Sequence, residues 1–402
     1  MTIPDHSAPP LRILHVLRAP LGGLFRHVVD LTRAQAARGH LVGMVTDSLT
    51  GGARAEQALA ELAPALALGV TRIAMRRNPH PSDIVALARV LTVIRIAVPD
   101  VVHGHGSKGA VYARAASLMP GGGGPVRAYT PHGGSFNYRP GSGVHRVYMK
   151  VERLLAGATD IFLFESAFIE ARFRHYVGAT RAPSRVIVNG ISPCEFVPVA
   201  PDADAADFLY VGELRSAKGI DTLIDALALV RDRTSAAHRA VLVGSGPDQA
   251  LLTEHARHVS LQHQISFAGA MPARDAFRLG RVMVVPSRAE SLPYVVLEAA
   301  GARVPLIATN VGGIPEIFGP HAGRLIACDN PMVLADEMLR QLHLAKMDQQ
   351  REAQELAEFV EQRFSIARMT DGVIAGYRSA LAARLASRTG AAAAAVGGPA
   401  KL

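Results

Sequence analysis

The chain has 402 residues, of which 49% are apolar and 19% charged, and this composition excludes a largely disordered protein. The length exceeds what a single hydrophobic core usually holds, so two domains are expected. The net charge of +9 suits anionic partners. Because the basic residues are spread along the chain without a concentrated stripe, nucleic acid is not an expected partner.

The cysteine content and the N-terminus indicate the compartment. The two cysteines, Cys194 and Cys328, form no C-x-x-C pair, so neither a disulfide framework nor a zinc motif is indicated. The opening MTIPDHSAPP lacks the positive charge and apolar run of a signal peptide. No apolar stretch reaches the roughly 18 residues of a membrane span. We expect a cytoplasmic protein, peripheral at most on the anionic inner-membrane surface.

The first half of the chain alternates apolar runs with segments of helical periodicity. Behind the first run, Leu24, Val28 and Leu31 recur at helical spacing. The strand–helix–strand order predicts a parallel sheet. Strands are predicted at 11–17, 41–47, 101–105, 126–131, 160–165 and 185–190.

The segment 191–206, rich in Pro, Ala and Asp, shows no periodicity and is the predicted linker. The alternation then starts again. Strands are predicted at 207–212, 240–244, 265–269, 282–286 and 305–309, and helices at 219–232, 248–259, 273–280, 293–302, 331–346 and 349–362. The predicted fold class is α/β, with two Rossmann-like, doubly wound parallel-sheet domains facing across a cleft.

The domain boundaries follow from this pattern. An N-terminal Rossmann-like domain is expected over 1–195 and a C-terminal one over 196–365. An amphipathic helix over 366–386 is expected to cross back to the first domain. The Gly- and Ala-rich tail, 387–402, is expected to be disordered.

The segment VMVVPSRAESLPYVVLEAA predicts a strand, a short loop and a helix. Pro293 suits the first helical turn, so the amides of Ser291 and Leu292 would meet an anion at the helix start. Glu290 in the loop and Glu298 in the second turn bracket this place, because helical side chains lean toward the N-terminus. One carboxylate could hold sugar hydroxyls and the other a ribose. Taken singly, both glutamates would be interpreted as solvated surface residues, but the strand–loop–helix setting reverses that interpretation.

Two further loops follow predicted strands of the second half. In VGELRSAKG, Arg215 and Lys218 stand beside a helix start, where cations can neutralise a diphosphate leaving group. In VGSGP, Gly244 and Gly246 form a turn that lets the backbone approach a ligand closely. This turn lacks the third glycine of a dinucleotide fingerprint.

Histidines and glycines mark the strand ends of the first half. His132, in YTPHGG, can donate a hydrogen bond to a sugar hydroxyl. His103 and His105, in VVHGHG, could bind a metal, but no third ligand stands at a convincing spacing. We therefore interpret them as contacts for an acceptor. Gly22 and Gly23 precede a helix and allow either a close phosphate approach or simply a tight turn.

The run from Pro286 to Ile317 carries a family resemblance. E-S-L-P-Y-V-V-L-E, followed by G-x-x-V-P-L-I-A-T-x-V-G-G-I-P-E-I, resembles the nucleotide-sugar site of the family-four retaining glycosyltransferases, which have the GT-B fold. The resemblance covers most of the chain and is strongest over 207–320. It implies that Glu290 contacts the donor sugar and Glu298 the ribose.

The same resemblance implies further roles. Lys218 matches the lysine of the family's Gly-Arg…Lys-Gly loop, whereas Glu213 stands where many members have arginine. Arg215 is the candidate replacement. His132 would lie at the donor sugar. The donor phosphates and base would be contacted by Gly22, Gly23, Gly244, Gly246, Phe267 and Gly269.

The function implied by the resemblance is transfer of a sugar from a nucleotide-sugar, UDP-sugar in preference to GDP-sugar, with retention of configuration. The acceptor would be a glycan or a polyprenyl-linked saccharide in bacterial exopolysaccharide or lipopolysaccharide synthesis. The N-terminal domain would bind the acceptor and the C-terminal domain the donor. The D-x-D triplet of Asp202 and Asp204 lies in the linker, and we interpret it as two solvated carboxylates rather than as a metal site. No metal and no other cofactor are therefore expected.

Three alternatives remain open. A nucleotide-sugar epimerase or hydrolase would share the architecture. An NAD-dependent oxidoreductase would need Gly-x-Gly-x-x-Gly after the first strand of a domain, which neither half has. A non-catalytic sugar-nucleotide binder is favoured only by Glu213.

Overall fold

The computed structural model describes residues 9–119 and 124–396, without the side chains of Asn137 and of 388–396. The chain divides into two compact units, and each is described by itself. The first unit comprises Met1–Val188 and Ile366–Leu402, and the second unit comprises Asn189–Ser365. The predicted end of the tail, 397–402, lies outside the described residues.

The first unit contains a parallel sheet in the strand order β3-β2-β1-β4-β5-β6-β7. All strands are parallel, but successive strands are added on one side of β1 up to β3 and on its other side from β4 onward. Such a switch point, here between β1 and β4, opens a crevice at the carboxyl ends of the strands. The strands are β1 (Arg12–Leu17), β2 (Leu41–Asp47), β3 (Val70–Ile73), β4 (Val101–His105), β5 (Val126–Thr130), β6 (Ile161–Phe164) and β7 (Ser184–Val186). Strand β3 was not predicted, because its four residues, VTRI, include an arginine and a threonine.

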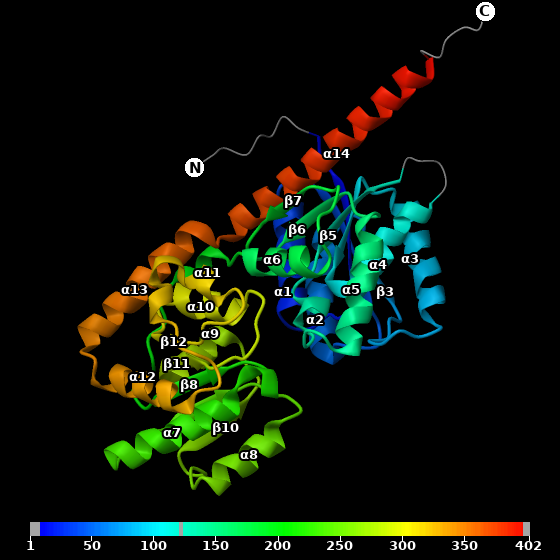
Figure 1. Ribbon diagram of the computed structural model, residues 1–402. Helices are drawn as coiled ribbons and strands as arrows, with labels where there is room; N and C mark the ends of the chain where they lie inside the picture. Colours follow the sequence, from blue (N-terminus) through cyan, green and yellow to red (C-terminus); the bar gives the residue numbers. More distant parts are fainter. Residues whose placement is uncertain (1–8, 120–123, 397–402) are drawn as a thin grey trace, which may run out of the picture. The chain divides into compact units, whose positions relative to one another are not determined.

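Helices cover both faces of this sheet (Figure 1). On one face Ile13 and Val101 pack against α1 and α14, and on the other Leu14 and Val102 pack against α3 and α4. The helices are α1 (Gly22–Ala36), α2 (Gly52–Leu62), α3 (Asp83–Ala97), α4 (Gly106–Arg114), α5 (Gly143–Ala156), α6 (Ala167–Tyr176) and α14 (Ile366–Val396).

Helix α14 belongs to the first unit, although it follows the second unit in the chain. Arg38, in the turn after α1, pairs with Asp371 at 2.9 Å. Met369, Val373 and Tyr377 pack in the core of the sheet face. The helix continues to Val396, so the prediction of a disordered tail from 387 is wrong over 387–396. The physical reason is the alanine run, because alanine has the highest helix propensity.

The second unit contains a smaller parallel sheet in the order β10-β9-β8-β11-β12, which again reverses at its centre, between β8 and β11. The strands are β8 (Ala206–Val211), β9 (Ala240–Val243), β10 (Ile265–Gly269), β11 (Gly280–Val285) and β12 (Leu306–Ala308). The predicted linker holds a short 3₁₀ turn at Pro193–Phe196 and leads into β8.

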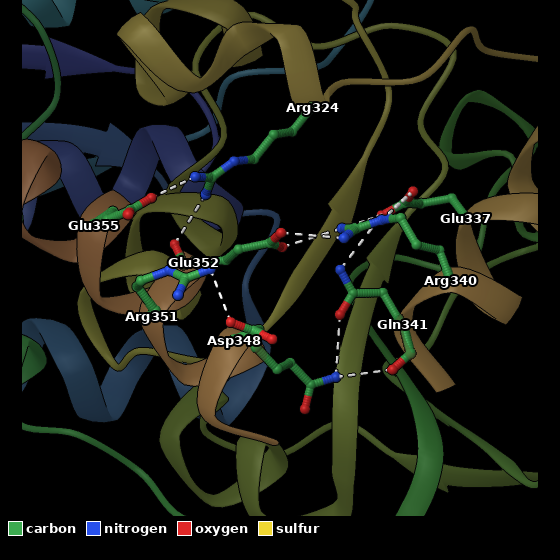
Figure 2. A network of polar contacts seen from close by, with 9 residues as sticks. Arg324, Glu337, Arg340, Gln341, Asp348, Arg351, Glu352 and Glu355 are labelled. Atoms are coloured by element: carbon green, nitrogen blue, oxygen red, sulfur yellow. Dashed lines mark hydrogen bonds and ion pairs between the residues drawn. The ribbon is translucent and has the colours of Figure 1, made fainter. Parts of the chain in front are cut away.

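The helices of the second unit follow the prediction closely, and α11 was not predicted. They are α7 (Ile220–Thr234), α8 (Gln249–His258), α9 (Ala273–Ala276), α10 (Tyr294–Gly301), α11 (Ile314–Phe318), α12 (Pro331–His343) and α13 (Lys346–Arg363). A polar network joins α12 to α13 (Figure 2). In it Arg340 pairs with Glu337 at 2.8 Å and with Glu352 at 3.1 Å.

The predicted fold class is confirmed: both units are α/β with a doubly wound parallel sheet. In the described part of the chain, no helix combines the length and the apolar character that crossing a membrane requires.

Candidate functional site

Two loops at the switch point of the second sheet bring a lysine and a glutamate together. Lys218 lies in the 3₁₀ turn after β8, and Glu290 lies in the loop after β11. Lys218 Nζ donates to Glu290 Oε1 at 2.5 Å, and Ser287 Oγ donates to the same oxygen at 2.8 Å. The side chains are only 17% and 9% exposed, so the pair is largely shielded from water.

Glycines allow the loops to approach this closely. A Cβ on Gly219 would lie 2.0 Å from the carbonyl oxygen of Pro286, and one on Gly312 would lie 1.9 Å from that of Glu290. Both glycines also have positive φ, +65° and +60°. A side chain at either position would therefore be strained and would push the loops apart.

Arg288 fixes the lysine loop from the other side, and the sequence analysis missed it. Its guanidinium donates to both carboxylate oxygens of Asp221 at 2.8 Å. Its amide donates to the carbonyl of Ala217 at 2.9 Å, next to Lys218. Burial alone would raise the pKa of Asp221, but the hydrogen bonds and charge of Arg288 lower it.

The loop before α10 presents free amides. The helix begins at Tyr294 with Pro293 as its N-cap, one residue later than predicted, because ψ of Pro293 is extended at 124°. Among the described residues, none accepts a hydrogen bond from the amides of Ser291 or Leu292. These amides stand just before a helix start, whose dipole favours an anion. Glu298, one turn further on, is half-buried.

The first unit carries a cluster of five histidines at its own switch point. His15 of β1 and His103 of β4 are register partners, and His105 follows on the same face of β4. His27 of α1 and His132, after β5, complete the cluster. All except His132 are at most 2% exposed.

A hydrogen-bond chain runs through these rings. His15 Nε2 lies 2.8 Å from Gln35 Oε1, His15 Nδ1 lies 2.9 Å from His105 Nε2, and His105 Nδ1 lies 3.0 Å from His132 Nε2. A side branch joins His103 to Tyr377 OH at 2.7 Å and to Thr130 Oγ1 at 2.9 Å.

The amide of Gln35 gives this chain a direction. A carbonyl oxygen only accepts, so His15 donates from Nε2 and, while neutral, accepts at Nδ1. His105 therefore donates from Nε2 and accepts at Nδ1, and His132 donates from Nε2. In this arrangement His132 Nδ1 is left as an acceptor, and a contact of this ring with the donor sugar stays a prediction.

Burial keeps these rings neutral. It lowers the pKa of His15 to about 4, with the Gln35 hydrogen bond acting in the opposite direction. Burial, followed by the neighbouring imidazoles, also holds the pKa values of His103, His105 and His132 well below the usual range. His132 itself adopts φ +53°, a strained conformation for a residue other than glycine, and such strain concentrates at functional sites.

Comparison with known proteins identifies both units. The family model of glycosyl transferases group 1 matches residues 195–356, and that of glycosyltransferase family 4 matches 21–194. TuaC of Bacillus subtilis, named for teichuronic acid biosynthesis, is 36% identical over 138 residues, which are 34% of this chain and 32% of that protein. The matched part is thus about a third of TuaC. The glycogen synthase of Mycobacterium tuberculosis is 28% identical over 74% of this chain and 76% of its own.

A solved structure supports the fold. Anabaena HepE, in complex with UDP, superposes with a TM-score of 0.73 at 18% identity, covering 91% of this chain and 99% of its own. The chain belongs to the GT-B glycosyltransferases of group 1 and family 4.

In this glycosyltransferase, Glu213 forms an exposed ion pair with the candidate phosphate ligand Arg215. Glu213 pairs with Arg215 at 3.2 Å, and the side chains are 54% and 47% exposed. An exposed pair of this kind contributes little to stability. Arg215 is therefore loosely held, whereas Lys218 is fixed against Glu290.

The other predicted donor-loop residues divide into two kinds. A Cβ on Gly244 would lie 1.8 Å from the carbonyl oxygen of Gly212, and one on Gly246 would lie 2.2 Å from that of Leu214. These glycines therefore allow two loops of the glycosyltransferase to pack together, and this packing explains them without a bound ligand. Phe267 packs half-buried against the core. The carbonyl of Gly269 accepts from the amide of Gly244 at 2.8 Å.

The histidines of VVHGHG are not placed as expected. His103 and His105 are 0% and 1% exposed, because their face of β4 is covered by α1 and α14, so neither offers a surface to an acceptor. The structure does supply the third imidazole that the spacing did not reveal. Ligand atoms of His15, His103 and His105 lie within 4.8 Å of one another, as do those of His27, His105 and His132.

The histidine cluster is poorly suited to a metal. Both ring nitrogens of His103 and of His105 already take part in hydrogen bonds of 2.7–3.0 Å. A metal would have to displace these partners, so the cluster fits a proton-ordered chain better than a metal centre. At the start of α1, Gly22 has φ +67°, and no side chain caps the helix, which leaves its first amides open to an anion.

Proposed function

We propose that the protein transfers a glycosyl group from a nucleotide-sugar to a glycan or polyprenyl-linked acceptor, with retention of the anomeric configuration. The donor is a UDP-sugar in preference to a GDP-sugar. The process is bacterial cell-surface polysaccharide synthesis, of the exopolysaccharide or lipopolysaccharide type, on the cytoplasmic face of the inner membrane. TuaC is named for teichuronic acid biosynthesis, and the HepE structure contains UDP, which supports these choices.

The observation that carries the proposal is the shielded Lys218–Glu290 pair at the switch point of the second sheet. A lone buried pair contributes little to net stability, so its position between two loops at the strand ends favours a role in binding. Glu290 accepts hydrogen bonds from hydroxyls of the donor sugar. Lys218 moves onto a phosphate oxygen and stabilises the charge that develops on the diphosphate as the glycosidic bond breaks.

The remaining donor contacts complete the anion site. The amides of Ser291 and Leu292 donate to the diphosphate, and Glu298 binds the ribose. Arg215 exchanges its exposed pairing with Glu213 for the same diphosphate. His132 accepts from a substrate hydroxyl at Nδ1, and because the ring stays neutral it adds no positive charge near an oxocarbenium-like state.

Retention follows from front-face attack. Glu290 is bonded to Lys218 and Ser287 and is therefore a poor nucleophile. The acceptor hydroxyl attacks from the side on which the diphosphate leaves, and the diphosphate takes its proton. Lys218 and Arg215 supply the positive charge that a divalent metal would supply, so transfer proceeds without metal. Loss of activity in a chelator, restored by magnesium or manganese, would contradict this.

The donor site is tested by thermal shift with UDP, GDP, ADP and TDP and their sugars, in the presence of chelator. A ligand at 100 times its dissociation constant adds about 2.7 kcal/mol of stability. We expect the UDP series to give the largest shift and Glu298→Ala to abolish it. Glu254→Gln is the matched control, because Glu254 is an exposed acid of α8 in the same unit.

Product analysis then separates transfer from its rivals. Sugar appearing on an acceptor with unchanged anomeric configuration supports the proposal. Consumption of the donor without acceptor indicates a hydrolase or epimerase. A shift with NAD and none with any nucleotide-sugar overturns the proposal.

Helix α5 supports a peripheral membrane location. One side of it exposes Val144, Val147, Val151 and Leu154, each 39–79% exposed at helical spacing. Arg146 and Lys150 flank this stripe and are also exposed. An apolar stripe beside cations is the pattern of a helix that lies in an anionic lipid interface.

The location is tested by co-sedimentation with vesicles. Vesicles containing phosphatidylglycerol should bind the protein, and pure phosphatidylcholine should not. Val147→Ser combined with Leu154→Ser should abolish binding, whereas Ile84→Ser combined with Ile96→Ser, at exposed apolar sites of α3, should not. Equal binding by both double variants would refute a role for α5.

A further inference from the structure

A basic pocket lies at the carboxyl edge of the first sheet, on the β1–β2–β3 side. It has a volume of about 420 Å³. Arg18 follows β1, Thr50 follows β2, and Arg76 and Arg77 follow β3, so the pocket is built from the ends of three neighbouring strands. Ligands of parallel α/β sheets bind outside these strand ends.

Three arginines line the pocket: Arg18 is half-buried, and Arg76 and Arg77 are exposed to solvent. Within 9–119 and 124–396, no hydrogen bond or ion pair engages the side chains of Arg18, Arg76 or Arg77. Arg72 provides the contrast, because its guanidinium donates to the carbonyls of Asp47 and Thr50 and is thereby used to hold the loops together.

The electrostatics indicate a missing anion. Burial, and with it the charge of Arg77, lowers the pKa of Arg18, while Asp47 acts in the opposite direction. Asp47 is fully buried, and its carboxylate accepts from the amides of Leu49 and Met75 and from Thr50 Oγ1, so it is committed to the loop. Like charges held together at a strand edge are stabilised by a bound anion.

The loop that carries two of the arginines is held in place. Lys108 Nζ donates to the carbonyls of Arg76 and Asn78 at 2.5 and 3.1 Å, and it pairs with Asp83 at 2.8 Å. Lys108 lies in the first turn of α4, which directly follows His105 at the end of β4. The pocket is therefore pre-formed and does not depend on a ligand to gather its loop.

We propose that this pocket binds a phosphoryl group, and that this group is the diphosphate of the acceptor. Guanidinium groups bind phosphate oxygens in a bidentate manner, and three of them match the charge of a diphosphate better than that of one carboxylate. This inference rests on the proposed function, since it names the chemistry of the acceptor. It assigns Arg18, Arg76 and Arg77 to acceptor recognition, a role that the sequence analysis had given to His103 and His105.

The pocket is tested with inorganic pyrophosphate on the full-length protein by titration calorimetry, with hydrogen-exchange mass spectrometry to locate binding. Because a diphosphate also suits the donor loops, the titration is repeated on Lys218→Met. We expect protection over 74–80 that persists in Lys218→Met. Arg76→Gln combined with Arg77→Gln should weaken binding by about tenfold or more. Arg89→Gln, an exposed arginine of α3 in the same unit, should change it less than about twofold.

Two further probes identify the source of the group. Farnesyl diphosphate should bind with the same arginine dependence as pyrophosphate, which supports a lipid-linked acceptor. Binding of pyrophosphate alone would assign the pocket to a free anion and overturn the acceptor role. Equal binding of glucuronate would overturn the choice of a phosphoryl group, and so would protection confined to the loops of the second unit.

The outcomes for the two proposals are separable. If nucleotides shift the melting temperature but pyrophosphate does not bind, the pocket is refuted and the donor site stands. If pyrophosphate binds with arginine dependence and no nucleotide binds, the pocket stands and the proposed donor site is refuted. The arginine variants should leave the nucleotide shift unchanged.

Discussion

Acidification should unfold the first unit before the second, because its buried histidines stay neutral in the folded chain and bind protons only once the chain unfolds. His15 is fully buried, and burial lowers its pKa to about 4 from the ordinary value near 6.5. Between these two values the unfolded chain binds a proton that the folded chain does not. The stabilisation is therefore complete above pH 6.5 and is lost as the pH falls toward 4.

The magnitude follows from the size of the shift. One pKa unit corresponds to about 1.4 kcal/mol, so His15 alone removes on the order of 3 kcal/mol by pH 4. His103, His105 and His132 act in the same direction, since burial lowers their pKa values too. Domains are stabilised by only about 5–15 kcal/mol, so the loss should be decisive for the first unit.

The assay is urea unfolding at pH 7.5, 6.0 and 5.0, read for each unit by hydrogen-exchange mass spectrometry. The second unit is an internal control, because every one of its histidines is at least partly exposed. In His15→Gln, the free energy of unfolding should depend less steeply on pH than in the unchanged protein. The slope should be smaller by about 1.4 kcal/mol per pH unit, which is the contribution of one proton. Equal acid sensitivity of the two units, or an unchanged slope in the variant, would refute the reasoning.

Three further outcomes are expected. Lys218→Met and Glu290→Gln should each destabilise the second unit by about 2–3 kcal/mol in urea, because each leaves a shielded group without its partner. The double variant should lose at least about 1 kcal/mol less than the sum, and additivity would argue against a coupled pair. Gly312→Ala should cost about 2 kcal/mol or more by thermal unfolding, since its φ is +60° and its Cβ would lie 1.9 Å from a carbonyl oxygen. Gln35→Leu removes the acceptor that orders the histidine chain, so nitrogen NMR should show the proton of His132 moving from Nε2 to Nδ1. An unchanged tautomer would show that Gln35 does not set the direction.

Local sequence was sufficient for the loops of the second unit. Glu290, Ser291 and Leu292 stand between an apolar strand and a helix, and this order predicts both the turn and the open amides. The partner of Glu290 could not be predicted from spacing, because Lys218 lies 72 residues earlier in the chain. Arg288 was missed for the same reason.

The sequence by itself determined the alternation of strands and helices, and hence two doubly wound sheets, because buried parallel strands must be apolar on both faces. It also determined the donor-loop motif. Only the tertiary structure decided which strand ends become neighbours. The sheet order places β1 between β2 and β4, which brings His15 against His103 and His105 and gathers Arg18 with Arg76 and Arg77. These groups are far apart in the chain, and their burial and mutual charge, which set their chemistry, exist only once the sheet has formed.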